Sequence, residues 1–223
     1  MKTLLLIGAL TLGAITTQAQ DYKQPLTKAW NAFDALPMEA SHDSKVQLAN
    51  KMELIAKKWD KDWAPHFYVA LTKTILSYDE KDVAKHDAIL DDAEKELGDA
   101  IKGLTKNTDE TYVLAAMIAN SRMAADPMSR WPKYGKIFTD NLQSAKEINA
   151  SNPRMYYLKG VSTYFTPAAY GGGKKNALPY FEKADGFFAT EKGDDIDKPY
   201  WGKKANTYFF GECKKDDKEV NKN

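Results

Sequence analysis

The sequence predicts an all-α protein, and two observations support that fold class. Apolar residues recur at spacings of three and four along the chain, and no segment shows the strict alternation of a β-strand. In addition, four of the expected helices carry an alanine seven positions after another small or apolar residue. These pairs are Ala49/Ala56, Ala93/Ala100, Phe138/Ala145 and Ala177/Ala184. The second members lie 44, 45 and 39 residues apart, a period typical of stacked helical hairpins.

We expect nine helices, at residues 24–36, 43–59, 64–78, 82–104, 109–125, 129–150, 153–165, 174–190 and 199–215. Several starts are indicated by side chains that cap free amide groups, at Asp82, Asp109, Ser129 and Asn152. Other starts are indicated by prolines suited to a first turn, at Pro65, Pro153 and Pro199. Helix ends are indicated by Gly103, Asn107, Pro127, Pro167 and the glycines at 171–173.

Within each hairpin, the small residues let two antiparallel helices approach closely, and a bulky residue between them fills the space against the next pair. Leu97, Leu142 and Phe181 take this bulky position, whereas Glu53 departs from the pattern. The last helix has no partner after it, so we expect it to cap an open end of the stack.

The first nineteen residues have the layout of a secretory signal. Lys2 precedes an apolar run over residues 4–15, and small residues stand at Thr17 and Ala19, so we expect cleavage after Ala19. Gly8 and Gly13 interrupt the run, which is shorter than the roughly 20 apolar residues of a membrane span. We therefore expect a periplasmic or secreted protein, with no stable membrane insertion after residues 1–19 are removed.

The balance of charge argues against two broad classes of partner. The chain has 32 basic and 31 acidic residues, and loss of Lys2 with the signal leaves it formally neutral. A general binder of nucleic acids or of membrane surfaces carries a marked positive excess, so neither class of partner is expected, while local basic patches are compatible with this balance. Cys213 is the only cysteine, and an intramolecular disulfide is thereby excluded.

No motif in the sequence indicates catalysis, a metal or a cofactor. The histidines His42, His66 and His86 lack zinc-site spacing, and no Gly-x-Ser-x-Gly elbow is present. Carboxylates are spread over every helix face without marking a pair. The glycines 171–173 followed by Lys174 are interpreted as a flexible turn, with an anion cradle as the alternative.

Guanidinium groups and amphipathic aromatics near helix ends are the candidate binding residues, since such side chains are favoured in binding sites. They are Arg122, Arg130, Trp131, Lys133, Tyr134 and Tyr170. The alternative interpretation is packing, in which Trp131 and Tyr134 close a hairpin corner. An ion pair between Asp126 and Arg130 would accompany that arrangement.

Part of the sequence resembles the tetratricopeptide repeat. Asn152, Pro153, Tyr156, Gly160 and Tyr164 are followed by Ala177, Phe181 and Ala184, in the Ala-x3-Phe-x2-Ala pattern of that repeat's second helix. The connection over residues 166–175 is about five residues longer than the family allows. The sequence also resembles exported tetratricopeptide-like proteins of the Bacteroidetes type. This resemblance is clearest in segments 126–131, 152–160, 170–174 and 177–181, and it covers nearly the whole mature chain.

This resemblance implies a right-handed solenoid of about four antiparallel helix pairs and a C-terminal capping helix over residues 20–213, followed by a polar tail at 214–223 that we expect to fray. Its repeat positions are Ala93, Ala100, Ala145, Tyr156, Gly160, Ala177, Phe181 and Ala184. The resemblance brings no established activity and no ligand-binding residues. A looser similarity to the periplasmic helical subunit of TRAP-type transporters implies a transport-accessory role.

The function that follows is an exported scaffold without catalysis of its own, which binds a protein, a peptide or a small ligand. An accessory subunit of a solute transporter is the second hypothesis. An enzyme on a helical scaffold is the third, and it requires a deep cleft with convergent acids or histidines.

Overall fold

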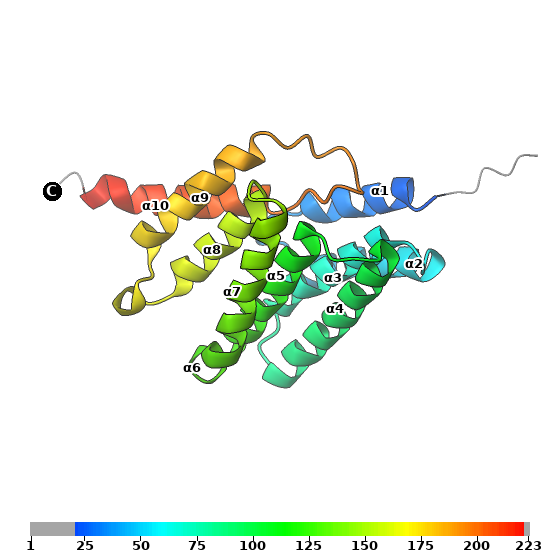
Figure 1. The fold of residues 1–223 in the computed structure, drawn as a ribbon, viewed down its shortest axis with the longest axis horizontal. Helices are drawn as coiled ribbons and strands as arrows, with labels where there is room; N and C mark the ends of the chain where they lie inside the picture. The colour runs from blue at the N-terminus through cyan, green and yellow to red at the C-terminus, as the bar shows by residue number, and fades with distance from the viewer. Residues whose placement is uncertain (1–20, 221–223) are drawn as a thin grey trace, which may run out of the picture.

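The computed structural model describes residues 21–220, with side chains through residue 215, and its regular structure is helical throughout that range. Nine helices of at least twelve residues follow one another (Figure 1). They are α1 (Lys23–Asp34), α2 (His42–Lys58), α3 (Trp63–Ser77), α4 (Val83–Leu104), α5 (Asp109–Ala125), α7 (Lys136–Ile148), α8 (Pro153–Phe165), α9 (Lys174–Phe188) and α10 (Lys203–Val220). The all-α prediction is confirmed, and each expected helix has its counterpart. The predicted signal segment, residues 1–19, lies outside the described residues.

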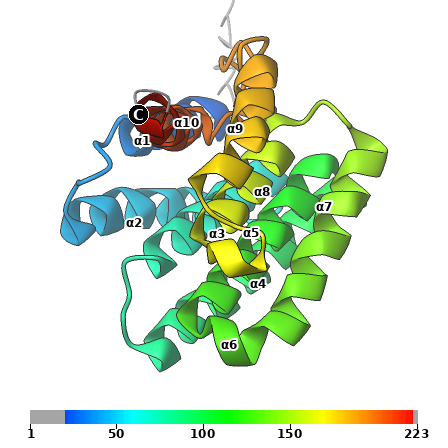
Figure 2. The same ribbon diagram turned by 90° about the vertical axis from the view of Figure 1, so that its left-hand side faces the viewer.

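The helices pack as a row of hairpins. The closest pairs are α3 with α4, α5 with α7 and α8 with α9, and each hairpin also touches the next through α4 and α5 or through α5 and α8. Figure 2 shows the same arrangement from the side, with α7 at one flank and α2 at the other. No helix within residues 21–220 is both long enough and apolar enough to cross a bilayer.

The final helix does more than cap an open end, which corrects the prediction from the sequence. Helix α10 packs on α9, and it also lies end to end with α1 along one side of the molecule (Figure 1). Lys204 at its start donates hydrogen bonds to the carbonyl of Asp34, the last residue of α1, and to those of the next two residues. Trp30 of α1 donates one to the carbonyl of Tyr200 at 3.1 Å. The two ends of the row are thereby joined.

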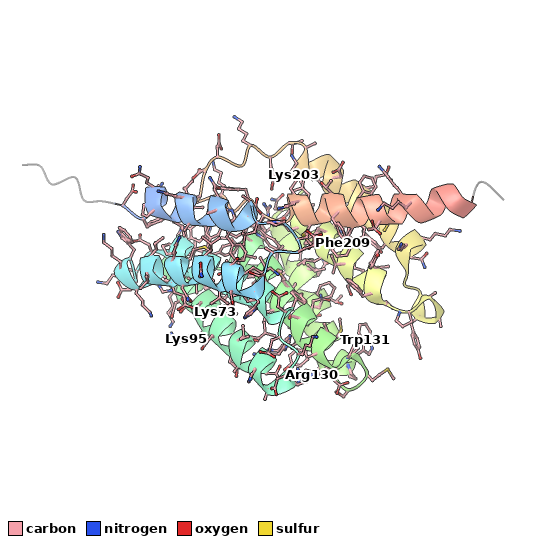
Figure 3. The ribbon with its side chains drawn as sticks, turned by 180° about the vertical axis from the view of Figure 1, so that it is seen from behind. Lys73, Lys95, Arg130, Trp131, Lys203 and Phe209 are labelled. Carbon is pink, nitrogen blue, oxygen red and sulfur yellow. The ribbon has the colours of Figure 1, made fainter. Side chains whose placement is uncertain are left out.

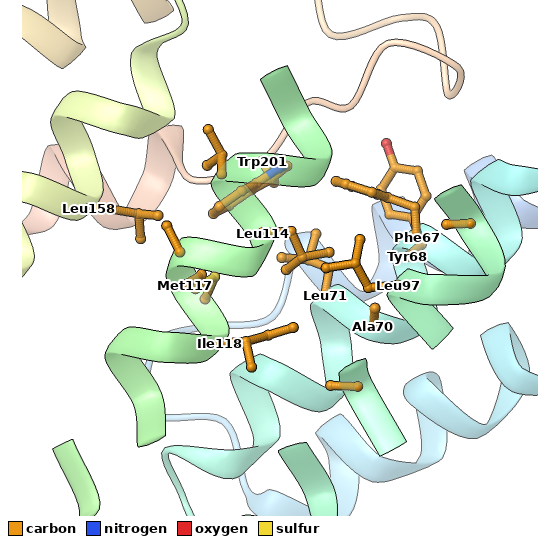
Figure 4. Close-up of a cluster of buried hydrophobic side chains, with 14 of the residues drawn as sticks. Phe67, Tyr68, Ala70, Leu71, Leu97, Leu114, Met117, Ile118, Leu158 and Trp201 are labelled. Atoms are coloured by element: carbon orange, nitrogen blue, oxygen red, sulfur yellow. The ribbon is translucent and has the colours of Figure 1, made fainter. Parts of the chain in front are cut away.

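The alanine positions lie where the helices pack against one another. Ala93, Ala100, Ala145, Ala177 and Ala184 are all fully buried. Their burial has the expected physical cause, because a methyl group lets neighbouring backbones come close. Leucines and aromatic rings of α3, α4 and α5 fill the centre of the core beside them (Figure 4).

Close packing requires glycine at one of the repeat positions. A Cβ atom added to Gly160 of α8 would lie 2.6 Å from the ring of Phe181 on α9. We expect Gly160→Ala to destabilise the protein by about 1–3 kcal/mol, because the ring has to move out of a filled space. Gly186 is the matched control, since it also lies within a helix and no atom lies within 4 Å of its added Cβ.

Urea unfolding followed by circular dichroism measures both changes. Gly186→Ala is expected to stabilise α9 by up to about 1 kcal/mol, because alanine is the better helix former. Equal effects of the two substitutions would contradict the packing explanation.

Two stretches of helix differ from the prediction. Residues 129–150 were expected as one helix, but the structure has a four-residue segment α6 (Pro127–Arg130), a π-helical turn η1 (Trp131–Gly135) and then α7. Pro132 lies inside this turn, and proline removes an amide donor from the helical pattern.

The predicted polar tail is helical as far as Val220, supported at its start by an ion pair between Glu212 and Lys215.

Candidate functional site

A hollow between α7, α8 and α9 is the candidate site, and we name it the lysine slot. Its volume is about 250 Å³. It is lined by Phe138, Thr139, Leu142, Gln143, Lys146, Met155, Tyr156, Lys159 and Tyr180. The lining combines apolar side chains with two lysines and contains no carboxylate. Small-molecule sites commonly have this composition, in which apolar walls surround a few polar groups.

Helical spacing places these side chains on facing surfaces. Phe138, Leu142 and Lys146 follow one another at intervals of four on α7, so they form one stripe along that helix. On α8, Met155 and Lys159 are likewise four residues apart. The slot therefore has an apolar interior and a lysine on each of two facing helices.

Tyr156 is held rigidly at the slot. Its hydroxyl donates a hydrogen bond to the carbonyl of Ala150 at 2.9 Å, and its ring lies 5.5 Å from the ring of Phe187, measured between centroids. The ammonium group of Lys183 lies over the same ring, 4.4 Å from its centroid. A ring fixed in this way offers a preformed surface to a flat ligand.

The two slot lysines are exposed, and no carboxylate among the described residues lies within ion-pair distance of either. Many other lysines of the chain are paired, such as Lys45 with Asp79 and Lys73 with Glu53. The charge of Lys146 and Lys159 is therefore available to an anionic group that enters from solvent.

A second and larger hollow, of about 480 Å³, lies at the N-terminal ends of α5 and α8. Its charged lining residues are Asp109, Glu110, Arg154, Glu191, Asp197 and Lys198. Carboxylates outnumber cations there, so an anionic ligand is disfavoured. We name this region the acidic pocket.

Buried Arg154 organises the acidic pocket. Its guanidinium group donates two hydrogen bonds to Glu191, at 2.7 and 3.1 Å, and one to Glu110 at 3.2 Å. It lies between the rings of Phe188 and Trp201, 5.6 and 5.4 Å from their centroids. The pKa of Glu110 is raised by burial, against the opposing charge of Arg154. These contacts fasten the segment after α9 to the core.

The two buried histidines, His66 and His86, make structural contacts. His66 faces Glu96 at 2.6 Å and the carbonyl of Asp60 at 3.0 Å, and the hydrogen bond to Glu96 raises its pKa. His86 is buried beside Ser121, and burial lowers its pKa. Neither hollow is lined by a histidine or cysteine, and no group of three potential metal ligands occurs among the described residues.

The candidate binding residues from the sequence do not line either hollow. Arg122 is buried, and its guanidinium group contacts Asp87, Asp91 and Glu94, so it is a structural residue. Arg130 pairs with Asp87 at 2.7 Å in place of the expected Asp126, which caps α6 through Ser129.

The aromatic candidates have different surroundings. Tyr134 is partly buried, with the ammonium of Lys133 over its ring at 4.9 Å, whereas Trp131 and Tyr170 are exposed. Figure 3 shows Trp131 beside Arg130 at the outer corner formed by α6 and η1.

The glycine turn has no free amides for an anion. The amides of Gly171, Gly172 and Gly173 donate to the carbonyls of Ala168, Pro167 and Thr163, respectively. A Cβ atom on Gly172 would lie 1.9 Å from the carbonyl oxygen of Thr166, so glycine is required there by close packing. The structure thus favours the interpretation of this segment as a structural turn.

The fold and the slot together define a helical binding protein. No family model matches the sequence. No curated protein matches it either. Among solved structures, the chain is similar to the HusA haemophore from Porphyromonas gingivalis, at 29% sequence identity and a TM-score of 0.74. The similarity covers 89% of this chain and 96% of the other.

A haemophore is a binding protein and not an enzyme, so this similarity agrees with the expectation that the chain has no catalysis of its own. The source of that protein is also a member of the Bacteroidetes, as the sequence resemblance implied.

Proposed function

We propose that this protein is an exported carrier that binds haem, or a porphyrin of the same shape and charge, in the lysine slot. The similarity to a haemophore supports the class of ligand. The observation that carries the proposal is the pair of exposed lysines beside an apolar slot, because haem combines a flat apolar ring system with two carboxylates.

Charge favours the slot over the acidic pocket. Two unit charges 4 Å apart interact with about 1 kcal/mol in water and about 4 kcal/mol at a protein surface. In the slot, Lys146 and Lys159 attract the two carboxylates of haem. In the acidic pocket, the same carboxylates would meet Asp109, Glu191 and Asp197. The smaller hollow is therefore the better site for this ligand.

The apolar walls supply the remaining affinity. Tyr156 and Tyr180 present ring surfaces, and Phe138, Leu142 and Met155 complete the lining from within the core. Burial of apolar surface contributes about 25 cal/mol per Å². The slot volume of about 250 Å³ lies below the 300–1,000 Å³ of most small-molecule sites, so we infer that part of the porphyrin stays outside. An accessible edge suits a carrier, which has to release its ligand.

The fit of the iron is a separate question from the fit of the ring. Tyrosine and methionine both serve as haem ligands in proteins, and of the two such residues in the lining, Tyr180 is partly exposed whereas Met155 is buried. The hydroxyl of Tyr156 is already engaged with Ala150. We infer that ring contacts and the lysines contribute more to binding than iron coordination does.

The proposal is tested by titrating the chain from residue 20 with haem and with the same porphyrin lacking iron, followed by absorbance. We expect saturable binding of one molecule per chain for both compounds, with affinities within about tenfold. Absence of saturable binding with both haem and the iron-free porphyrin would refute the proposed function. Binding of haem alone would show that iron coordination dominates instead.

The proposal also includes a tetratricopeptide-like solenoid architecture and export from the cytoplasm. The row of hairpins supports a tetratricopeptide-like solenoid, and the sequence at residues 1–19 supports export to the periplasm or the exterior. A transport-accessory role is compatible with the same site, since a carrier delivers its ligand to a receiving protein.

A further inference from the structure

Exposed apolar side chains gather on two neighbouring turns of the hairpin row. Met128 and Trp131 lie between α5 and α7 and are 85% and 61% exposed. Phe165 and Tyr170 lie between α8 and α9 and are 68% and 76% exposed. The two turns close consecutive hairpins of the row, α5 with α7 and α8 with α9 (Figure 1). We name these four residues the aromatic edge, and none of them lines the lysine slot or the acidic pocket.

The edge is held in place by packing. The ring of Trp131 lies against the backbone of Gly135, where an added Cβ would be 2.6 Å from the ring. Phe165 contacts the rings of Tyr164 and Phe209 at centroid distances of 5.0 and 5.9 Å. Tyr170 belongs to the short helix η2 (Ala168–Tyr170), which leads into the hydrogen-bonded glycine turn. Trp131, Phe165 and Tyr170 are therefore supported by packing or by a hydrogen-bonded turn.

The turns that carry the edge contain several basic residues. Segments 127–139 and 166–181 contain Arg130, Lys133, Lys136, Lys174 and Lys175, and Asp126, Asp140 and Glu182 stand directly outside these segments. Arg130 and Lys136 are paired with Asp87 and Asp140 outside these segments. Lys133 and Lys175 follow Trp131 and Tyr170 closely in the sequence and add positive charge to the two turns. Exposed large apolar side chains that gather on neighbouring turns indicate an interaction site.

We propose that the aromatic edge docks the protein on an anionic lipid bilayer. Trp131 and Tyr170 have the amphipathic rings that settle at the boundary between headgroups and acyl chains, and Met128 and Phe165 supply purely apolar contact. The flanking lysines attract anionic headgroups. A bilayer fits better than a protein partner, because the four side chains project from turn tips and do not line a hollow.

This docking is independent of the lysine slot and goes beyond porphyrin binding. It would hold the carrier at a membrane surface by peripheral contact, which agrees with the lack of any spanning helix within residues 21–220. The proposal predicts that attachment weakens as salt rises, because part of it is electrostatic.

Sedimentation with vesicles tests the proposal. The chain from residue 20 is mixed with phosphatidylcholine vesicles that contain or lack phosphatidylglycerol. We expect association with the anionic vesicles, reduced at least tenfold in the double variant Trp131→Ser/Phe165→Ser. The matched control is Leu54→Ser/Ile148→Ser, which removes two apolar side chains that are 66% and 53% exposed on other surfaces. We expect the control to sediment like the unmodified chain.

Three outcomes would overturn the proposal. The first is absence of the unmodified chain from the anionic vesicle pellet. The second is an equal loss in the edge variant and the control variant. The third is concentration-dependent self-association without lipid that the edge substitutions abolish, because the edge would then join two copies of the chain. Porphyrin titration of the edge variant should be unchanged, so failure of docking and failure of the proposed function are distinguishable.

Discussion

Arg154→Met is expected to lower the free energy of unfolding by about 3–5 kcal/mol, because it leaves buried charge without a partner. Arg154 is buried between two rings and pairs with Glu110 and Glu191. Methionine fills most of the volume but leaves Glu110 with only Asn152 and Trp201 as hydrogen-bond donors. Chemical denaturation at neutral pH measures the loss.

Arg122→Met is the matched control for this substitution. Arg122 is also buried and also contacts three carboxylates, but Asp91 and Glu94 are exposed to solvent. Water can solvate those two groups after the substitution, so we expect a smaller loss of about 1–2 kcal/mol. A loss from Arg154→Met no larger than that of the control would contradict the role of the buried network.

The loss from Arg154→Met is also expected to depend on pH. Burial holds the pKa of Glu110 above its ordinary value, and removal of Arg154 raises it further. A carboxyl whose folded pKa is raised binds protons more tightly in the folded state, so stability is greatest below its unfolded pKa and falls as pH rises through the folded pKa. The variant should therefore be least impaired in mild acid, and Glu110→Gln added to it should restore stability at neutral pH.

The second large effect concerns ligand binding. We expect Lys146→Glu/Lys159→Glu to weaken porphyrin binding by about 100-fold, equivalent to about 2.7 kcal/mol. Two attractions between lysines and ligand carboxylates become two repulsions, while the apolar walls of the slot are unchanged. Absorbance titration of the variant against the unmodified chain measures the change.

A variant with the same change in net charge separates a local from a general effect. Lys51 and Lys57 are exposed on α2, and neither lines a hollow. We expect Lys51→Glu/Lys57→Glu to alter affinity by less than about threefold. Similar losses of affinity in both double variants would mean that the porphyrin binds elsewhere, or that its attraction to the protein depends only on net charge.

Much of the fold could be predicted from local sequence signals. Asn152 and Asp82 cap α8 and α4 as expected, because a side-chain oxygen there accepts a hydrogen bond from an amide of the first turn. For α5 the cap is Thr108, one residue before the expected Asp109. Pro199 does not start a helix, since α10 begins at Lys203 after an extended connection. Local propensity could not show that this connection is used to pack Tyr200 and Trp201 against distant elements.

Much less of the candidate site could be predicted from the sequence. Arg122 resembles a surface arginine in the sequence, and it is buried because α4, about 30 residues earlier, supplies its carboxylate partners. Lys146 and Lys159 resemble ordinary solvated lysines, and their relevance arises only from the hollow between α7 and α8. The one signal that pointed toward the slot was the stripe of Phe138, Leu142 and Ala145, which marked the inward face of α7.

The most direct test of the porphyrin site is a map of backbone amide chemical shifts on titration with the iron-free porphyrin. We predict that the largest changes fall on residues 138–146 of α7, 155–159 of α8 and around Tyr180 of α9. Changes concentrated at the acidic pocket or the aromatic edge, or no changes at all, would contradict the account.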